Sequence, residues 1–257
     1  MQNSLKDKLG RGEVSIGTWI TINSPDIVEL VSGVGFDFLI FDMEHSPLTA
    51  ESVQSLLQVM KTPTPVPLAR VAWNDHVMIK LALDIGVSGL VIPLIKNEVD
   101  VKNAIQATKY PPQGTRGIGP RRASDFYRSF QDYFKEANTQ LLTILQIEHV
   151  DAVEGLDKII LEAKSSSGVD AFFVGPADLS ASMGLFGKYD HPEFKRVLDL
   201  ILKKSNEAKI PVGIHAFSVE DAKKRASEGF KLIVVSSDVA IIGQAFAQTV
   251  NATKELK

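Results

Sequence analysis

The sequence predicts a barrel of eight parallel β-strands, each followed by an α-helix. Strand-like and helix-like segments alternate along the chain with short connections, which is typical of right-handed βαβ units that build a parallel sheet. Eight such units can be counted, and 257 residues are about the usual length of a (β/α)8 barrel. Because no low-complexity segment or linker interrupts the pattern, we expect a single domain over residues 1–257.

A doubly wound open sheet is the alternative fold for such an alternation. Its usual signature is a glycine-rich GxGxxG turn after the first strand, where the backbone approaches a bound dinucleotide. No such turn follows the first predicted strand in this chain. We therefore favour the closed barrel, for which the 44% hydrophobic content provides one large core.

The strands are predicted from short apolar runs that are bounded by turn residues. The second strand is the clearest, because a mostly apolar run begins at Phe36, as in a strand buried on both faces, and Pro47 closes the segment. In order, the strands are expected at residues 14–22, 36–41, 66–71, 89–93, 141–148, 170–175, 210–214 and 231–235.

The helices between these strands are predicted partly from capping signals. Ser24, Pro25 and Asp26 form a strong helix start, and Asn74 is expected to cap a helix over residues 75–85. The other helices are expected at residues 49–60, 98–109, 150–165, 191–208, 219–228 and 239–249. The long connection over residues 110–140 contains two adjacent prolines, three glycines and a short helix near residues 129–138, and we interpret it as a functional loop.

Composition excludes several classes of function. The formal net charge is -3 and the pI is about 6.0, so no basic field would attract nucleic acid or an anionic membrane. No cysteine is present, which excludes disulfides, thiolate metal sites and a thiol nucleophile. The N-terminal segment is polar and charged without a signal-peptide core, and no apolar run approaches the roughly 20 residues of a membrane span. We therefore expect a cytoplasmic protein.

Polar residues gather where the predicted strands end. Active sites in (β/α)8 barrels form at the C-terminal ends of the strands, so these residues are expected to meet at one rim. In chain order they are Asp42, Glu44 and His45, then Arg70, then Gln146, Glu148 and His149, then Gly175 to Asp178, then His215, and finally Ser236 to Asp238.

Glu148 and Asp178 follow neighbouring strands and are candidates to share one cation. Since the chain has no cysteine, a hard cation such as Mg²⁺ or Mn²⁺ fits best, held by two carboxylates together with water and substrate oxygens. The alternative is that these acids cap the helices that follow them, for which Asp178 is well placed. The pattern alone leaves both interpretations open.

Arg70 and His45 are the other candidates at this rim. Arg70 emerges from an apolar strand with a permanent charge whose fork suits a substrate carboxylate, and the alternative is a structural ion pair with a strand-end acid. His45 is a candidate acid/base group whose tautomer Asp42 would fix, and the alternative is a hydrogen-bonded surface histidine. Among the remaining histidines, His215 is the better second candidate because it also ends a strand.

Motifs along the chain resemble the HpcH/HpaI family of class II pyruvate aldolases. They are FDMEHSP, PLARVAWND, LDIG, YPPQGTRGIGPRRAS, LQIE and VGPADLS, and the resemblance extends from Gly17 to about Ala247. The family includes 4-hydroxy-2-oxoheptanedioate, 2-keto-3-deoxy-rhamnonate and 2-dehydro-3-deoxy-glucarate aldolases. The resemblance implies a barrel of the phosphoenolpyruvate/pyruvate superfamily type, a divalent metal ion (Mg²⁺, Mn²⁺ or Co²⁺), and reversible cleavage of a 2-keto-4-hydroxy acid to pyruvate and an aldehyde.

The resemblance also implies roles for individual residues. Glu148 and Asp178 match the family's metal ligands, and Arg70 matches the arginine that binds pyruvate and steadies its enolate oxygen. His45 matches the acid/base histidine, and Asp42 matches its carboxylate partner. The pyruvate-contacting positions correspond to Gln146, Gly175, Pro176 and Ala177, and Asp84 corresponds to an acid that reaches a neighbouring subunit's site in some members. In the family the last helix is exchanged between subunits, and homo-hexamers are usual.

Two segments depart from the family pattern. Residues 165–168 lengthen a connection at the rim opposite the chemistry, where no effect on catalysis is expected. Residues 120–127 differ from the sugar-acid aldolases and are expected where the acceptor aldehyde is recognised, so the identity of the aldehyde stays open.

Three alternatives to a metal-dependent aldolase stay open at this point. One is a citramalyl- or malyl-CoA lyase, although only Arg116, Arg121 and Arg122 offer charge for the phosphates of a CoA tail. Another is an aldolase that uses a lysine Schiff base, although neither Lys80 nor Lys96 occupies a convincing buried position. The third is a barrel that binds 2-keto acids without catalysis.

Overall fold

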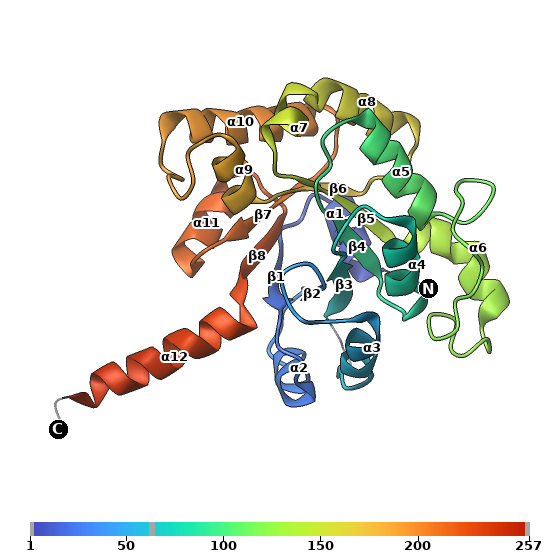
Figure 1. Ribbon diagram of the computed structural model, residues 1–257, viewed down its shortest axis with the longest axis horizontal. Coiled ribbons are helices and arrows are strands. Elements are labelled where there is room, and N and C mark those ends of the chain that lie inside the picture. Colours follow the sequence, from blue (N-terminus) through green and yellow to red (C-terminus); the bar gives the residue numbers. More distant parts are fainter. Residues whose placement is uncertain (1–2, 62–64, 255–257) are drawn as a thin grey trace.

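A computed structural model describes residues 3–61 and 65–254 and confirms the predicted fold. Within these residues, eight parallel strands pair in chain order, and β8 pairs with β1 to close the barrel (Figure 1). The strands are β1 (Ser15–Ile20), β2 (Phe38–Asp42), β3 (Val66–Arg70), β4 (Gly89–Ile92), β5 (Leu142–Ile147), β6 (Ala171–Val174), β7 (Val212–Ala216) and β8 (Leu232–Ser237).

Helices follow the strands and surround most of the barrel (Figure 1). They are α1 (Ser4–Gly10), α2 (Pro25–Val31), α3 (Ala50–Gln58), α4 (His76–Asp84), α5 (Glu98–Thr108), α6 (Phe130–Gln140), α7 (Val150–Glu154), α8 (Leu156–Ser165), α9 (Pro176–Ser182), α10 (Pro192–Glu207), α11 (Val219–Glu228) and α12 (Asp238–Ala252). Among the described residues, none of these helices is both long enough and apolar enough to cross a membrane.

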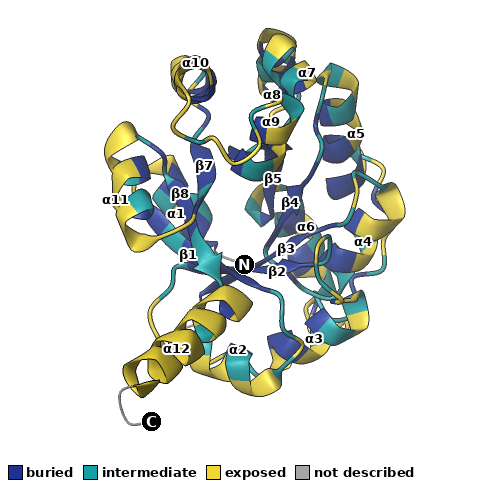
Figure 2. Ribbon diagram, turned by 60° about the vertical axis from the view of Figure 1, so that its left-hand side comes forward, coloured by how far each residue is buried: buried dark blue, intermediate teal, exposed yellow. Residues whose placement is uncertain are grey.

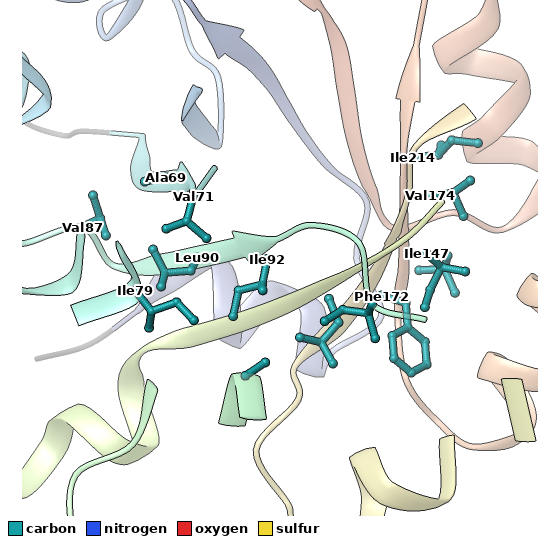
Figure 3. Packing of buried hydrophobic residues seen from close by; sticks show 14 of the residues in the cluster. Ala69, Val71, Ile79, Val87, Leu90, Ile92, Ile147, Phe172, Val174 and Ile214 are labelled. Atoms are coloured by element: carbon teal, nitrogen blue, oxygen red, sulfur yellow. The ribbon is translucent and has the colours of Figure 1, made fainter. Parts of the chain in front are cut away.

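Alternation along the strands sorts the apolar side chains into an inner and an outer core. In β2, Phe38 and Ile40 belong to the cluster inside the barrel, whereas Leu39 and Phe41 belong to the cluster between the barrel and its helices. Figure 3 shows part of the outer cluster, to which strands β3 to β7 contribute side chains. Because both faces of each strand are buried, the strands carry the continuous apolar runs from which they were predicted.

The N-terminal segment, for which only a polar character was expected, forms α1 and closes one end of the barrel. Leu5 and Leu9 are buried and join the inner cluster, to which Val66 and Leu142 also belong. Val66 and Leu142 are the first residues of their strands, so α1 covers the end at which the strands begin. The opposite end, where the strands finish, is left for the polar residues.

Three details of the helices differ from the prediction. Asp75, and not Asn74, caps α4, because its carboxylate accepts hydrogen bonds from the backbone of Val77 and Met78. The helix expected over residues 150–165 is divided into α7 and α8 at Gly155. The short helix α9 follows β6 directly and was not predicted. Asp178 is its third residue.

The last helix, α12, extends away from the barrel instead of packing on it (Figures 1 and 2). Only its first residue, Asp238, is buried, and that carboxylate accepts hydrogen bonds from the backbone of Thr21 and Ile22. Beside α11 a groove of about 680 Å³ is left open, with Ile16 and Val235 in its lining. The exchange of α12 between subunits stays a prediction.

Candidate active site

A cavity of about 320 Å³ lies at the C-terminal ends of the strands, the rim that the sequence predicts for the site. The structure brings most of the predicted residues together there. Those that line the cavity are Asp42, His45, Arg70, Gln146, Gly175, Pro176, Ala177 and Asp178. His215 also lines it, together with the aromatic side chains Trp19, Phe173 and Phe217.

The inward alternation of the strands explains why these residues meet. Asp42 stands two positions after the inner-core residue Ile40, and Arg70 two positions after Leu68. Gln146 likewise follows Ile144 by two positions on β5. Each polar residue therefore continues an inward-facing row into the open end of the barrel.

Arg70 forms a buried, two-pronged ion pair with Asp42. The two residues are directly opposite in the register of β2 and β3, and the Nε and Nη2 atoms of Arg70 donate to the two carboxylate oxygens at 2.9 and 2.7 Å. The guanidinium carbon lies 4.2 Å from the centroid of the Trp19 ring. Burial alone would raise the pKa of Asp42, but the hydrogen bonds and charge of Arg70 hold it below its ordinary value.

The predicted pairing of the Asp42 carboxylate with the His45 imidazole is wrong in this structure. Asp42 Oδ1 accepts the backbone N–H of His45 at 3.3 Å, while the carboxylate itself faces Arg70. The imidazole lies instead 3.7 Å from Glu44, and 62% of the His45 side chain is exposed at the mouth of the cavity. The register between β2 and β3 decides this outcome, because it places Arg70 directly opposite Asp42.

Glu148 is not itself a lining residue but lies buried directly behind Gly175 and Gln146, and its neighbours hold it in place. Its carboxylate accepts the backbone N–H of Leu94 at 2.8 Å and a hydrogen bond from the Gln146 side chain. A Cβ atom at Gly175 would stand 2.6 Å from Glu148 Oε2, so only glycine lets the backbone after β6 approach this carboxylate. Burial raises the pKa of Glu148 to about 7, and the charges of Glu44 and Asp178 act in the same direction.

Glu44 is a site residue to which the sequence assigned no role. Its Oε2 atom lies 3.2 Å from Arg70 Nε, but that N–H points to Asp42, so the buried oxygen has no hydrogen-bond partner among the described residues. Burial raises the pKa of Glu44 to about 7 despite the nearby charge of Arg70. Its position between Asp42 and His45 was the available signal, but only the folded register shows that it faces Arg70.

Asp84 is not part of this cavity. It ends α4, where it accepts a hydrogen bond from Arg116 at 2.7 Å, and the chain then turns to begin β4. It therefore lies at the rim where strands begin. Residues 120–127 also pack there, since Arg122 donates to the backbone oxygen of Ile85, and none of them lines the cavity of its own chain. A contribution of Asp84 to a neighbouring subunit stays a prediction.

The donor set fits a hard divalent cation. Asp42, Glu44, Glu148 and Asp178 bring four carboxylates near one guanidinium, that of Arg70, and burial, together with the charges of the neighbouring acids, raises the pKa values of Glu44 and Glu148. Within residues 3–61 and 65–254, no three acidic, histidine or cysteine side chains converge so as to hold a metal ion by themselves. An ion held by Glu148 and Asp178 would therefore need water and substrate oxygens as further ligands.

The raised pKa of Glu148 predicts how stability depends on pH in the metal-free protein. The folded protein holds the proton of Glu148 more tightly than the unfolded chain does. The contribution of this proton to the free energy of unfolding is therefore fully present below pH 4.5 and is lost as the pH rises through about 7. We expect Glu148→Gln to raise the melting temperature at pH 8 and to leave it nearly unchanged at pH 5. The gain is at most about 3 kcal/mol, and Gln146 can rotate its amide to accept from the new one.

Thermal unfolding at both pH values, in chelator, would measure this effect. Glu51→Gln, at an exposed position in the first turn of α3, is the matched control and should shift both values by the same small amount, because its charge acts only on the start of that helix. A Glu148→Gln variant that loses stability equally at pH 5 and pH 8 would contradict the prediction, because its carboxyl would then act through packing and not through its charge.

Comparison with known proteins agrees with this geometry. Residues 15–245 match the family model for HpcH/HpaI aldolase/citrate lyase. The 4-hydroxy-2-oxo-heptane-1,7-dioate aldolase of Shigella sonnei (strain Ss046) is 36% identical over 247 residues, which cover 95% of this chain and 92% of the relative.

Two solved structures show the same fold at similar identity. An HpcH/HpaI aldolase/citrate lyase family protein from Burkholderia cenocepacia J2315 superposes with a TM-score of 0.92 at 33% identity, covering 98% of this chain and 100% of the other. The HpcH/HpaI aldolase from Desulfitobacterium hafniense DCB-2 gives a TM-score of 0.90 at 30% identity, with 98% and 97% covered. The relatives of the present chain are carbon–carbon lyases, and this enzyme belongs with them to the HpcH/HpaI aldolase/citrate lyase family.

Proposed function

We propose that the enzyme is a divalent-metal-dependent aldolase that reversibly cleaves a 2-keto-4-hydroxy acid to pyruvate and an aldehyde. The observation that carries this proposal is that Asp178 and Arg70 line one cavity at the C-terminal rim of the barrel, with the buried Glu148 directly behind the lining residues Gly175 and Gln146. Breaking the C3–C4 bond of such a substrate leaves negative charge on the 2-keto oxygen of a pyruvate enolate. Fixed positive charge at this place stabilises the transition state that leads to it.

Glu148 and Asp178 would hold the metal ion, with Mg²⁺ or Mn²⁺ as the expected ions and Co²⁺ as a further candidate. When bound, such an ion supplies Lewis-acid stabilisation of the charge that develops on the keto oxygen. Gln146 keeps the Glu148 carboxylate in place by donating to it. Gly175, Pro176 and Ala177 form the cavity wall next to that carboxylate, where the absence of a side chain at Gly175 leaves room for pyruvate.

Arg70 adds a second positive charge for the same oxygen. Its guanidinium is fixed by Asp42 on one side and by the Trp19 ring on another, so little reorientation is needed when the substrate arrives. Because Asp42 accepts from Nε and from one N–H of Nη2, the two N–H groups of Nη1 and the second N–H of Nη2 are left for the substrate.

His45 is the proposed base that takes the proton from the 4-hydroxyl group and returns it in the synthetic direction. The imidazole lines the cavity and is largely exposed, so it lies at the mouth, where the 4-hydroxyl of a substrate anchored by its keto acid would lie. Glu44, 3.7 Å from the imidazole Nε2 atom, takes the orienting role that was first assigned to Asp42.

The Schiff-base aldolase and the CoA lyase, two of the alternatives, find little support in the site. Arg70 is the only arginine or lysine among the described residues that line the cavity, which leaves no lysine for a Schiff base and no cluster for the phosphates of CoA. Arg116 is buried against Asp84, and Arg121 lies against the Phe126 ring, so neither arginine is directed toward the cavity.

We expect chelation to abolish pyruvate release from a panel of 2-keto-4-hydroxy acids, and Mg²⁺, Mn²⁺ or Co²⁺ to restore it. Glu148→Gln and Asp178→Asn should each remove most of the restored activity because each deletes one anionic ligand, whereas Glu51→Gln should retain it. The measurement is a coupled assay for pyruvate at graded metal concentrations. Full activity after exhaustive chelation, or covalent trapping of pyruvate by borohydride, would favour a lysine Schiff base instead.

We also propose that α12 is exchanged between copies in a homo-hexamer, and that the enzyme acts in the cytoplasm. Val239, Phe246 and Val250 of α12 are more than half exposed, and such an apolar helix is stable only against a partner. The open groove beside α11 has the apolar lining that this helix requires. The number of six chains rests on the resemblance to the family.

Phe246→Glu should break the assembly, because it places a charge on the exposed apolar side of α12. Light scattering should give the mass of six chains for the natural protein and a smaller mass for this variant. Leu161→Glu, at a similarly exposed leucine of α8, is the control and should leave the mass unchanged. A fully active monomer of the natural protein would exclude the exchange.

A further inference from the structure

Trp19 and His215 are joined by a hydrogen bond inside the cavity. Trp19 Nε1 donates to His215 Nδ1 at 3.1 Å. An indole N–H can only donate, so the Nδ1 atom of His215 carries no proton, and a neutral imidazole must then carry its proton on Nε2. Trp19 therefore selects one tautomer of His215.

His215 also remains neutral at physiological pH. Burial lowers its pKa to about 4, and the charge of Arg70 acts in the same direction, against the charge of Asp221. The ring of Phe217 meets the imidazole edge to face, with centroids 4.7 Å apart, and Tyr189 stacks on Phe217 at the same distance. These contacts hold the imidazole as a rigid, uncharged donor.

The Nε2–H group of His215 is left for a ligand. His215 is the inward-facing residue at the end of β7, since Val212 and Ile214 face the outer core, and its side chain lines the cavity. Within the described residues, the imidazole makes no hydrogen bond other than the one from Trp19. A donor in this position would favour a ligand that brings an oxygen to it.

The position of β7 suggests which part of the substrate brings an oxygen to the Nε2–H group of His215. The residues proposed to bind the keto acid come from β3, from β5 and from the segment after β6, whereas His215 stands on β7 and Ser237, at the end of β8, lines the same cavity. Since Arg70 already pairs with Asp42 and Asp178 adds a negative charge, this side of the cavity favours an uncharged oxygen over a second carboxylate.

We propose that His215 donates a hydrogen bond from Nε2 to a hydroxyl oxygen on the aldehyde-derived part of the substrate, so that the enzyme prefers hydroxyaldehydes to alkyl aldehydes of the same size. Trp19 acts as a positioning residue that fixes the donor. This inference rests on the proposed aldolase function and adds the class of acceptor aldehyde to it.

The test compares glycolaldehyde with propanal as acceptors for pyruvate, in the full-length enzyme with saturating Mg²⁺. His215→Leu should lower the ratio of the two kcat/KM values by about tenfold to a hundredfold relative to the natural enzyme, the usual effect of losing one such hydrogen bond. His215→Gln, whose amide can accept from Trp19 and still donate, should restore most of the ratio. His76→Leu, at an exposed histidine of α4 that does not line the cavity, is the matched control.

Trp19→Phe provides a second route to the same answer. It keeps a ring beneath Arg70 but removes the N–H that selects the tautomer, so the aldehyde ratio should fall here too. The ¹⁵N NMR signals of His215 should show an unprotonated Nδ1 in the natural enzyme and a mixture of tautomers in this variant. A protonated Nδ1 in the natural enzyme would overturn the inference.

Oxaloacetate decarboxylation separates this inference from the function on which it rests, because that reaction passes through the pyruvate enolate without an aldehyde. If the natural enzyme decarboxylates oxaloacetate but His215→Leu leaves the aldehyde ratio unchanged, only the role of His215 is wrong. The role of His215 is also wrong if His215→Leu lowers decarboxylation as much as aldol addition. It is wrong as well if the variant lowers the reaction of pyruvate with succinic semialdehyde and not the reaction with glycolaldehyde. If the natural enzyme catalyses neither reaction, the proposed function fails and this inference fails with it.

Discussion

The buried ion pair between Arg70 and Asp42 is the interaction on which the rest of the site depends. Arg70 keeps its charge inside the barrel, and desolvation makes this costly unless the charge is matched by well-placed partners. Asp42 supplies that match from the paired position on β2. The further acids are buried beside a guanidinium that is already paired, so burial first and the charges of their neighbours second raise the pKa values of Glu44 and Glu148. Such a site favours either protonation of these carboxylates or the binding of a divalent cation.

The proposed chemistry divides the cavity into two sides. The charged groups follow β2, β3, β5 and β6, where a developing enolate and a metal ion would need them, and the neutral His215 stands on β7. Trp19 touches both sides, because its ring lies against Arg70 and its N–H binds His215. In the proposed chemistry, a single buried side chain from β1 would thus orient one group for the keto acid and another for the aldehyde.

The sequence predicted the fold and the rim correctly because both depend on local patterns: apolar runs of strand length, and polar residues where those runs end. It could not identify the partner of Asp42, since the contact with Arg70 depends on the register between two strands, whereas His45 is only three residues away. Glu44 was missed for the same reason. The course of α12 was not evident either, because an apolar face indicates that a helix needs a partner without showing which surface supplies it.

The most direct test of this account is to compare aldol cleavage with oxaloacetate decarboxylation in Arg70→Ala and His45→Ala, with the metal ion saturating. Both reactions pass through the enolate, but only cleavage needs a base for the 4-hydroxyl group. The account predicts that Arg70→Ala depresses both reactions. It predicts that His45→Ala lowers cleavage by about 10²–10⁴-fold and affects decarboxylation much less. An equal loss of both reactions in His45→Ala would contradict it, because His45 would then position pyruvate or the metal ion and would not act as the base.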